Sequence, residues 1–342
     1  MSDALSPEAI AAADPAGMLR DVLAQPHQYG DALWRVESAS IPRAENARGV
    51  VVCGMGGSAI GGDLAAAAIG LRATEPITTI RGYELPAWVG PDTLVLCASY
   101  SGNTEETLHC FEAAGAAGAP RVVVTTGGKL AEAARAAGDV PVIGVPSGMQ
   151  PRAAVVYMTV ATMMVAAPSL HDEIEATGAV IAELAEEWGG DGDSEPKRLA
   201  RALAGRIPVV YGGRSTAAPA RRWRSQLNEN AKIPAFYGDL PEAHHNEVVG
   251  WHHTDAPVTA VLLEAANEHE RMTARLDITA DVLAEAGIPA ERVKARGDSQ
   301  TARVMSLVLL GDLVSVYLGV LLGKDPTPVD EIESLKARLA RY

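Results

Sequence analysis

Short apolar runs rich in β-branched residues alternate with alanine-rich helical blocks along the first half of the chain. The runs have the length and composition of buried strands, and they cover residues 50–53, 77–80, 93–98, 122–126 and 141–145. Blocks such as EETLHCFEAAGAAG and KLAEAARAAG separate several of them, without hairpin turns. This repeated strand–helix alternation predicts a parallel sheet with helices on both faces.

The same order of elements begins again in the second half. The run IPVVYGGRS (207–215) repeats the apolar strand, double glycine and serine of VVVCGMGGS (50–58). A helical block and then a proline-led strand follow each copy, EPITTI in the first half and IPAFYG in the second. Further strands are expected at 257–264 and 291–295. This weak internal repeat predicts two related α/β domains.

A polar connector separates the two halves. The segment EEWGGDGDSEPKR (186–198) combines glycine, proline and mixed charge, which is typical of an exposed link between domains. We therefore expect an N-terminal domain over residues 1–190 and a C-terminal domain over residues 191–342.

One later segment, residues 304–323, is apolar for nearly the length of a membrane span. It carries Asp312 at its centre and lacks aromatic or basic anchors at its ends. A helix buried in the core or in a subunit interface explains these features better than a transmembrane helix.

Composition narrows the expected partners and location. The 43 acidic residues outnumber 29 basic ones, and the net charge of −14 disfavours binding to nucleic acid or anionic lipid. The densest basic cluster, RRWR (221–224), is interpreted as a solvated helix face. Three cysteines and the absence of a secretory signal pattern fit a reducing cytoplasm. We expect a cytoplasmic protein with no nucleic-acid or membrane partner.

The run GMGGSA (54–59) matches the GxGxxG/A fingerprint of dinucleotide-binding loops. The acidic residue that usually binds the ribose is replaced by Arg81, which could at best favour NADP. In the rival interpretation, Gly57 and Ser58 offer an amide and a hydroxyl at the start of a helix, where any phosphate is attracted. That site needs no dinucleotide cofactor.

A second loop, ASYSGNTEET, favours the phosphate interpretation. Ser99, Ser101 and Thr104 lie within six residues, just before a helix. Short hydroxyl side chains beside helix-terminal amides can bind a phosphomonoester. Either Ser101 or Thr104 alone would be explained as a helix cap. Because ligands of open α/β sheets bind at the carboxyl ends of strands, the two loops together predict a phosphate site.

Candidates for acid–base chemistry follow later in the chain. Glu229 falls on the polar face of a helical block with Arg222 and Gln226, where a solvated glutamate is the usual outcome, but the turn before this helix copies the ligand loop of the first half. The segment EAHHNEVVGWHH has neither HxxxH nor HExxH spacing, so one acid–base histidine is favoured over a metal site. Arg152 opens an apolar helix, which indicates either an anionic partner or a surface salt bridge.

Together, GMGGSAIGGD, SYSGNTEET, GGKLAE, PRAA, NENAK and HNE resemble motifs of the bifunctional phosphoglucose/phosphomannose isomerases. Members of this family contain two sugar-isomerase (SIS) domains, each a parallel sheet sandwiched by helices. The resemblance implies a metal-independent homodimer with shared active sites and no cofactor. It also implies interconversion of fructose 6-phosphate with glucose 6-phosphate and mannose 6-phosphate through a cis-enediol.

The resemblance further implies a role for each matching residue. The phosphate would be bound by Gly57, Ser58, Ser99, Ser101 and Thr104. Glu229 would move the proton between C1 and C2, and Arg152 would stabilise the enediolate. His245, from the partner subunit, would assist ring opening with help from Lys336. Thr327 is the candidate for the threonine that admits mannose 6-phosphate.

Two alternatives remain open from the sequence. Lys336 fits equally well as a surface lysine near a helix end. A non-catalytic SIS protein that senses a sugar phosphate would need the phosphate loops but none of Glu229, His245 and Arg152, all of which this chain has.

Overall fold

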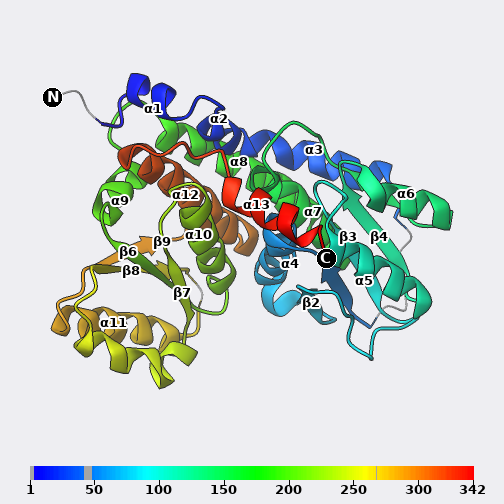
Figure 1. Cartoon of the computed structure of the whole chain (residues 1–342). Coiled ribbons are helices and arrows are strands. Elements are labelled where there is room, and N and C mark those ends of the chain that lie inside the picture. Colours follow the sequence, from blue (N-terminus) through cyan, green and yellow to red (C-terminus); the bar gives the residue numbers. More distant parts are fainter. Residues whose placement is uncertain (1–3, 42–47, 267) are drawn as a thin grey trace.

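The computed structural model describes residues 4–41, 48–266 and 268–342, and within these residues it contains two parallel sheets (Figure 1). The first sheet has the order β2-β1-β3-β4-β5, with β1 Val50–Cys53, β2 Ile77–Ile80, β3 Leu94–Ala98, β4 Arg121–Thr125 and β5 Val142–Gly144. The second has the order β7-β6-β8-β9, with β6 Ile207–Gly212, β7 Phe236–Asp239, β8 Val258–Glu264 and β9 Ala290–Lys294. Every predicted strand is confirmed, with boundaries shifted by up to three residues.

Helices cover both faces of the first sheet, as predicted. Alternate strand residues explain this arrangement, because Val51 and Cys97 pack towards one helical layer and Val52 and Leu96 towards the other. The first layer contains α5 (Glu105–Ala116) and α6 (Gly128–Ala137). The second contains α3 (Gln25–Ser38), α4 (Gly56–Ile69) and α7 (Val155–Ala166). A strand buried on both sides needs a continuous apolar run, which is the pattern seen in the sequence.

The second sheet repeats the order of the first, since β7-β6-β8-β9 corresponds to β2-β1-β3-β4. This correspondence confirms the internal repeat. One face packs on α11 (Glu270–Glu285). The other packs towards α9 (Glu195–Leu203), α10 (Ala217–Glu229) and α12 (Gln300–Leu321).

The predicted connector is shorter and less exposed than its composition indicated. Helix α8 (His171–Gly189) extends into it and α9 begins at Glu195, so only residues 190–194 are irregular. Lys197 is buried, because its ammonium donates to the carbonyls of Gly190, Asp191 and Gly192. A charged residue can be buried where backbone acceptors satisfy it.

Helix α12 lies between the two sheets (Figure 1). It is long and apolar enough to cross a membrane, but 94% of its most apolar window is buried against the rest of the chain. Its neighbours include α4 and α8 from the first half and α9 and α10 from the second. The prediction of a buried helix is confirmed, and the largest apolar core contains residues from both sheets.

Asp312 occupies the middle of α12 because a buried cation faces it. The side chain of Arg222 donates to both carboxylate oxygens, with Nε 2.9 Å from Oδ1 and Nη2 2.7 Å from Oδ2. Gln25 adds a third donor at 2.7 Å. Complete burial raises the pKa of the Asp312 carboxyl, while Arg222 acts in the opposite direction. The RRWR cluster is therefore not a solvated face throughout, since Arg222 is 2% exposed.

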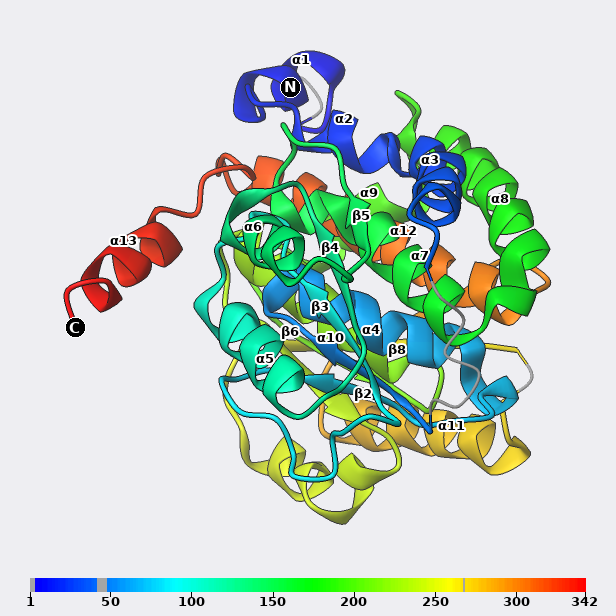
Figure 2. The same ribbon diagram turned by 90° about the vertical axis from the view of Figure 1, so that its right-hand side faces the viewer.

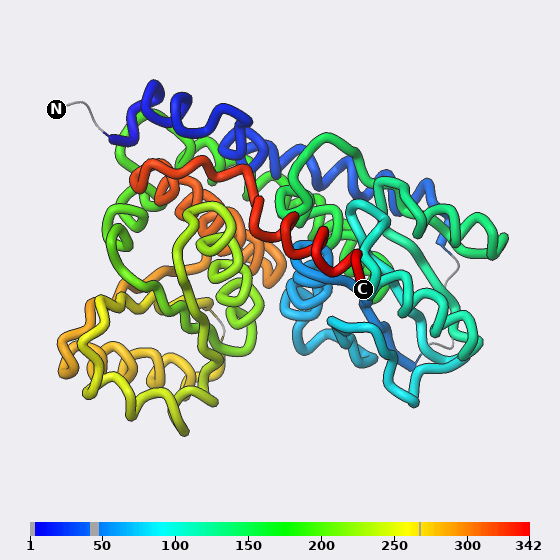
Figure 3. Tube along the Cα trace, in the orientation of Figure 1, coloured from blue at the N-terminus to red at the C-terminus, as the bar shows by residue number. Residues whose placement is uncertain are grey.

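The two ends of the chain differ in how they pack. At the N-terminal end, α1 (Pro7–Ala13) and α2 (Met18–Leu23) pack on α12, and α3 packs on α7 and α8 (Figure 3). At the C-terminal end, α13 (Asp330–Leu339) stands away from the body of the molecule (Figure 2), and it has no buried residue along its described length. The 3₁₀ segments are η1 Gly70–Arg72, η2 Pro151–Ala154, η3 Pro168–Leu170, η4 Glu242–His245 and η5 Glu247–His253.

Candidate active site

The two predicted phosphate loops meet at the carboxyl edge of the first sheet. Because β1 and β3 are neighbours, the loops that follow them lie side by side where the strand order reverses. Ser58, in the first turn of α4, is 7% exposed, and its Oγ accepts a hydrogen bond of 3.2 Å from the backbone N–H of Tyr100. The glycine-rich loop is thus joined directly to the loop after β3.

The hydroxyl groups of the second loop differ in their availability. Ser99 is 1% exposed, and its Oγ lies 2.8 Å from Thr104 Oγ1 and accepts from the Gly102 N–H at 3.1 Å. Ser101 is exposed, and its Oγ accepts from the Asn103 N–H at 3.2 Å. Thr104 precedes α5, but among the described residues its side chain bonds no amide of that helix. The helix-cap alternative is therefore wrong for Thr104, and the N–H groups at the start of α5 keep their capacity to donate.

Gly57 brings a third segment to the loops. A Cβ at this position would lie 3.1 Å from the carbonyl oxygen of Pro151 and 3.2 Å from Arg152 Cα. Glycine lets η2 approach the loop this closely, because a Cβ here would require the neighbouring backbone to shift by a few tenths of an ångström. The backbone of Arg152 is consequently packed against the predicted phosphate site.

Arg152 also reaches Glu229, which lies on the other half of the chain. Its side chain is 3% exposed, and Nη1 lies 3.7 Å from Glu229 Oε2. Nε donates to Asn230 Oδ1 at 2.7 Å, and Nη2 donates to the carbonyls of Pro326 at 2.8 Å and Thr327 at 2.7 Å. Burial lowers the pKa of the Arg152 guanidinium, whereas Glu229 acts in the opposite direction. Arg152 therefore has an anionic neighbour, Glu229, but it is too buried for a surface salt bridge, and its catalytic role stays a prediction.

This arrangement brings together a half-buried carboxylate, a buried guanidinium and two loops rich in neutral donors. Glu229 ends α10 and keeps 29% of its side chain exposed, so it can reach a small ligand. A carboxylate can move a proton between adjacent carbons, and a fixed cation can stabilise the oxyanion that develops. The expected solvated setting for this helix face is wrong, since Arg222 and Gln226 are both 2% exposed.

The single chain does not bring His245 or Lys336 to this pair. His245 lies on η4 with an exposed side chain that forms no hydrogen bond or ion pair with the described part of the chain. Lys336, 65% exposed on α13, pairs with Glu333 Oε1 at 3.0 Å. Their catalytic roles stay predictions.

The neighbouring histidine has a structural setting. His244 Nε2 lies 2.7 Å from Thr279 Oγ1, and Nδ1 lies 2.9 Å from Arg275 Nη1. Burial lowers the pKa of His244, and the charge of Arg275 acts in the same direction. Over residues 4–41, 48–266 and 268–342, no group of three or more His, Cys, Asp or Glu is placed to hold a metal ion. The expected absence of a metal stays a prediction.

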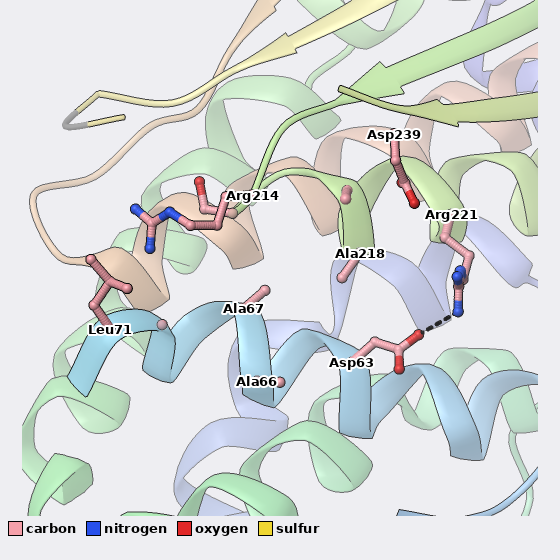
Figure 4. Close-up of a pocket in the computed structure, with 11 residues that line it drawn as sticks. Asp63, Ala66, Ala67, Leu71, Arg214, Ala218, Arg221 and Asp239 are labelled. Atoms are coloured by element: carbon pink, nitrogen blue, oxygen red, sulfur yellow. Dashed lines mark hydrogen bonds and ion pairs between the residues drawn. The ribbon is translucent and has the colours of Figure 1, made fainter. Parts of the chain in front are cut away.

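A cavity of about 430 Å³ lies elsewhere, between α4 and the start of α10 (Figure 4). Its described lining includes none of the predicted site residues. Asp63 at its edge pairs with Arg221 at 3.1 Å and with Arg81 at 2.6 Å. Arg81, the residue considered for NADP, therefore already has an anionic partner.

The repeated loop in the second half, around Ser215, binds the carboxylate of Glu268. The backbone N–H of Ser215 donates to Glu268 Oε1 at 3.1 Å, and the Ser215 hydroxyl contacts the same oxygen. The donors that correspond to those of Ser58 are thus occupied by a carboxylate of the chain itself.

Comparison with known proteins places this fold in one class. A family model described as bacterial phospho-glucose isomerase C-terminal SIS domain matches residues 192–339. A crystal structure of a hypothetical protein from Thermus thermophilus has a TM-score of 0.75 at 18% identity, covering 95% of this chain and 90% of that one. The chain is therefore an α/β protein of the SIS class.

The curated relatives identify the family within that class. A bifunctional phosphoglucose/phosphomannose isomerase from Caldicellulosiruptor bescii is 40% identical over 313 residues, which cover 87% of this chain and 91% of the relative. One from Aquifex aeolicus is 40% identical over 298 residues, covering 86% and 91%. The chain belongs to the bifunctional phosphoglucose/phosphomannose isomerase family, as the motifs predicted.

Several residues of the site were not singled out from the sequence. Asn230 and Lys232 lie in the quoted motif NENAK, but only Glu229 of that motif was given a role. Asn230 is fully buried and bonds both Arg152 and Ser315 Oγ, at 2.7 and 2.9 Å. The sequence signal for Asn230 is its position next to Glu229. Its burial could not be predicted, because it depends on α12, which lies about seventy residues later in the sequence.

Ser58→Ala tests the phosphate loops. We expect the KM for fructose 6-phosphate to rise about 10- to 100-fold with kcat less affected, because the variant loses one hydrogen bond to a charged group. Steady-state kinetics measure both constants. Ser215→Ala, in the repeated loop, is the matched control and should leave KM unchanged. Equal KM values for wild type and Ser58→Ala would remove Ser58 from the phosphate site.

Proposed function

We propose that this chain interconverts fructose 6-phosphate with glucose 6-phosphate and with mannose 6-phosphate. The observation that carries the proposal is the contact between Arg152 and Glu229 beside the two donor loops. Membership of the isomerase family supports the choice of substrates. A metal-independent reaction fits a site whose charged groups are a carboxylate and a guanidinium.

Each group has a role in the proposed mechanism. The phosphate lies between the two loops, where the Gly57 amide and the hydroxyls of Ser58, Ser101 and Thr104 donate to its oxygens. Ser99 supports this loop from behind, through its contact with Thr104. After the ring opens, a carboxylate removes the proton from one of the two carbons C1 and C2 and returns it to the other.

Glu229 supplies that carboxylate, and Arg152 stabilises the cis-enediolate formed between the two transfers. Thr327 supports the dual specificity, because its carbonyl accepts from Arg152 while its buried Oγ1 has no hydrogen-bond partner among the described residues. An unpaired hydroxyl beside Arg152 supports a role for Thr327 in contacting the sugar.

A coupled assay with fructose 6-phosphate in the presence of EDTA tests the function. We expect both glucose 6-phosphate and mannose 6-phosphate to form, at a rate that EDTA does not change. Binding of fructose 6-phosphate without turnover would instead favour a sugar-phosphate sensor. Loss of activity in EDTA with recovery on adding Zn²⁺ would contradict the metal-independent mechanism.

We further infer a homodimer with shared active sites. Exposed His245 is free to enter the site of a partner. Helix α13 supports the inference, because Ile332, Leu335 and Leu339 form an exposed apolar stripe at helical spacing. A helix of this kind is stabilised by packing on another surface.

Mixing two inactive variants tests the shared site. Glu229→Gln and His245→Ala homodimers should each lack most activity, whereas subunit exchange gives mixed dimers with one intact site. About a quarter of the wild-type rate is expected, since random exchange makes half the dimers mixed and leaves one of two sites intact. Sedimentation equilibrium checks the dimer. A monomer, or no recovery after proven exchange, would contradict the inference.

Two further features are part of the proposal. We place an N-terminal domain at residues 1–190 and a C-terminal domain at 191–342, which is supported by the presence of one sheet on each side of this boundary. The cytoplasmic location stays a prediction, supported by three free and buried cysteines, Cys53, Cys97 and Cys110.

A further inference from the structure

Lys232 has an unusual backbone conformation close to the end of the helix that carries Glu229. Its φ is +58°, in the left-handed region that residues with a Cβ rarely occupy. Such a conformation persists where surrounding contacts hold it in place. Hydrogen bonds of the Lys232 ammonium hold this residue in place.

The ammonium of Lys232 joins two segments that are far apart in sequence. Nζ donates to the carbonyl oxygen of Glu229, at the end of α10. It also donates to the carbonyls of Pro326, at 3.3 Å, and Pro328, in the segment between α12 and α13. An ammonium has three protons, and three backbone acceptors take them. Lys232 therefore has no proton left to give to a substrate.

The segment 326–328 is also what holds Arg152. The Arg152 Nη2 donates to the carbonyls of Pro326 and Thr327, so Pro326 accepts from both cations. Lys232 ties this segment to the end of α10, and the segment in turn fixes the guanidinium beside Glu229. Burial lowers the pKa of Lys232, and the nearby charge of Arg152 acts in the same direction. Although their positive charges repel each other, Arg152 and Lys232 both donate to backbone carbonyls of the segment 326–328.

We propose that Lys232 is a positioning residue of the isomerase site, which holds the segment 326–328 so that Arg152 stays in place beside Glu229. The proposal rests on the function proposed above. It differs from a general structural role because its effect passes through Arg152. Displacing a catalytic group by about 1 Å can cost about 10²-fold in rate, so the loss should fall on kcat.

Lys232→Met and Lys232→Gly test this role. Methionine keeps the length of the side chain without its charge, and glycine accepts the positive φ without strain, which protects the fold. We expect both variants to lower kcat about 10- to 100-fold while KM for fructose 6-phosphate changes less than about threefold. n-Butylammonium, which matches the removed side chain, should restore part of the kcat of Lys232→Gly. Lys324→Met, which removes an exposed lysine near the same segment, is the matched control.

A double-mutant cycle separates positioning from a general loss of structure. In an Arg152→Ala background, Lys232→Met should cause little further loss of kcat, because residues that act together are not additive. A full additional loss in that background, or a kcat within about twofold of wild type for both Lys232 variants, would overturn the proposal. Failure of the wild type to convert fructose 6-phosphate would instead count against the proposed function.

Discussion

The Glu229→Gln variant is expected to bind fructose 6-phosphate with wild-type affinity and to lose about 10²- to 10⁴-fold in kcat, the range attributed to general acid–base catalysis. Glutamine keeps the size of the side chain and its ability to face Arg152 at the end of α10, but it cannot accept and return the proton. The loss should therefore appear in the chemical step rather than in binding.

The coupled assay gives kcat, and calorimetry gives the dissociation constant of the inactive complex. Glu285→Gln is a matched control, because Glu285 is an exposed glutamate that also ends a helix, α11. Turnover by Glu229→Gln within about tenfold of wild type would show that another group moves the proton.

Asp312→Asn is expected to lower the free energy of unfolding by about 3–5 kcal/mol, because it leaves the buried charge of Arg222 without its partner. Water cannot replace the lost carboxylate as a partner of the guanidinium, because Arg222 is 2% exposed and Asp312 is fully buried. Urea denaturation measures the change. Activity should also fall, because Arg222 Nη2 donates to the Arg152 carbonyl at 2.9 Å.

The double variant Asp312→Leu/Arg222→Met is the informative comparison. Replacing a buried ion pair by apolar residues of similar volume is often neutral for stability, so we expect this pair to contribute little beyond what apolar packing would supply. We expect the double variant to recover most of the stability lost in Asp312→Asn. A change of less than about 1 kcal/mol in Asp312→Asn, or an equally unstable double variant, would contradict this account.

Local patterns predicted the strands and the two phosphate loops because both depend on short stretches of sequence. Strands buried on both faces need continuous apolar runs, and adjacent parallel strands bring their loops to one edge. Thus the loops of Ser58 and Thr104 could be assigned to the same edge of the sheet from the parallel direction of the strands alone. The sequence could not predict which hydroxyl groups are free to bind a ligand, because the burial of Ser99 depends on the path of its own turn.

The pairing of distant charges was beyond the reach of local patterns. Arg222 and Gln226 form a polar face of α10, which in isolation indicates solvent, but α12 covers that face with Asp312. The contact between Arg152 and Glu229 depends in the same way on how α10 packs against η2. Lys232 was overlooked because its role needs the segment 326–328, nearly a hundred residues further along the chain.

The position of α12 between the two sheets bears on which substitutions each half of the chain tolerates. The repeated loop of the second half contacts Glu268 of the same chain, so we expect substitutions there to leave substrate binding unchanged. The inner faces of both copies must remain complementary to one shared helix, so an apolar substitution in either half is constrained by the other. The surface loop of the second half therefore has to fit only a carboxylate of its own chain, whereas the interiors of the two halves have to fit one shared helix.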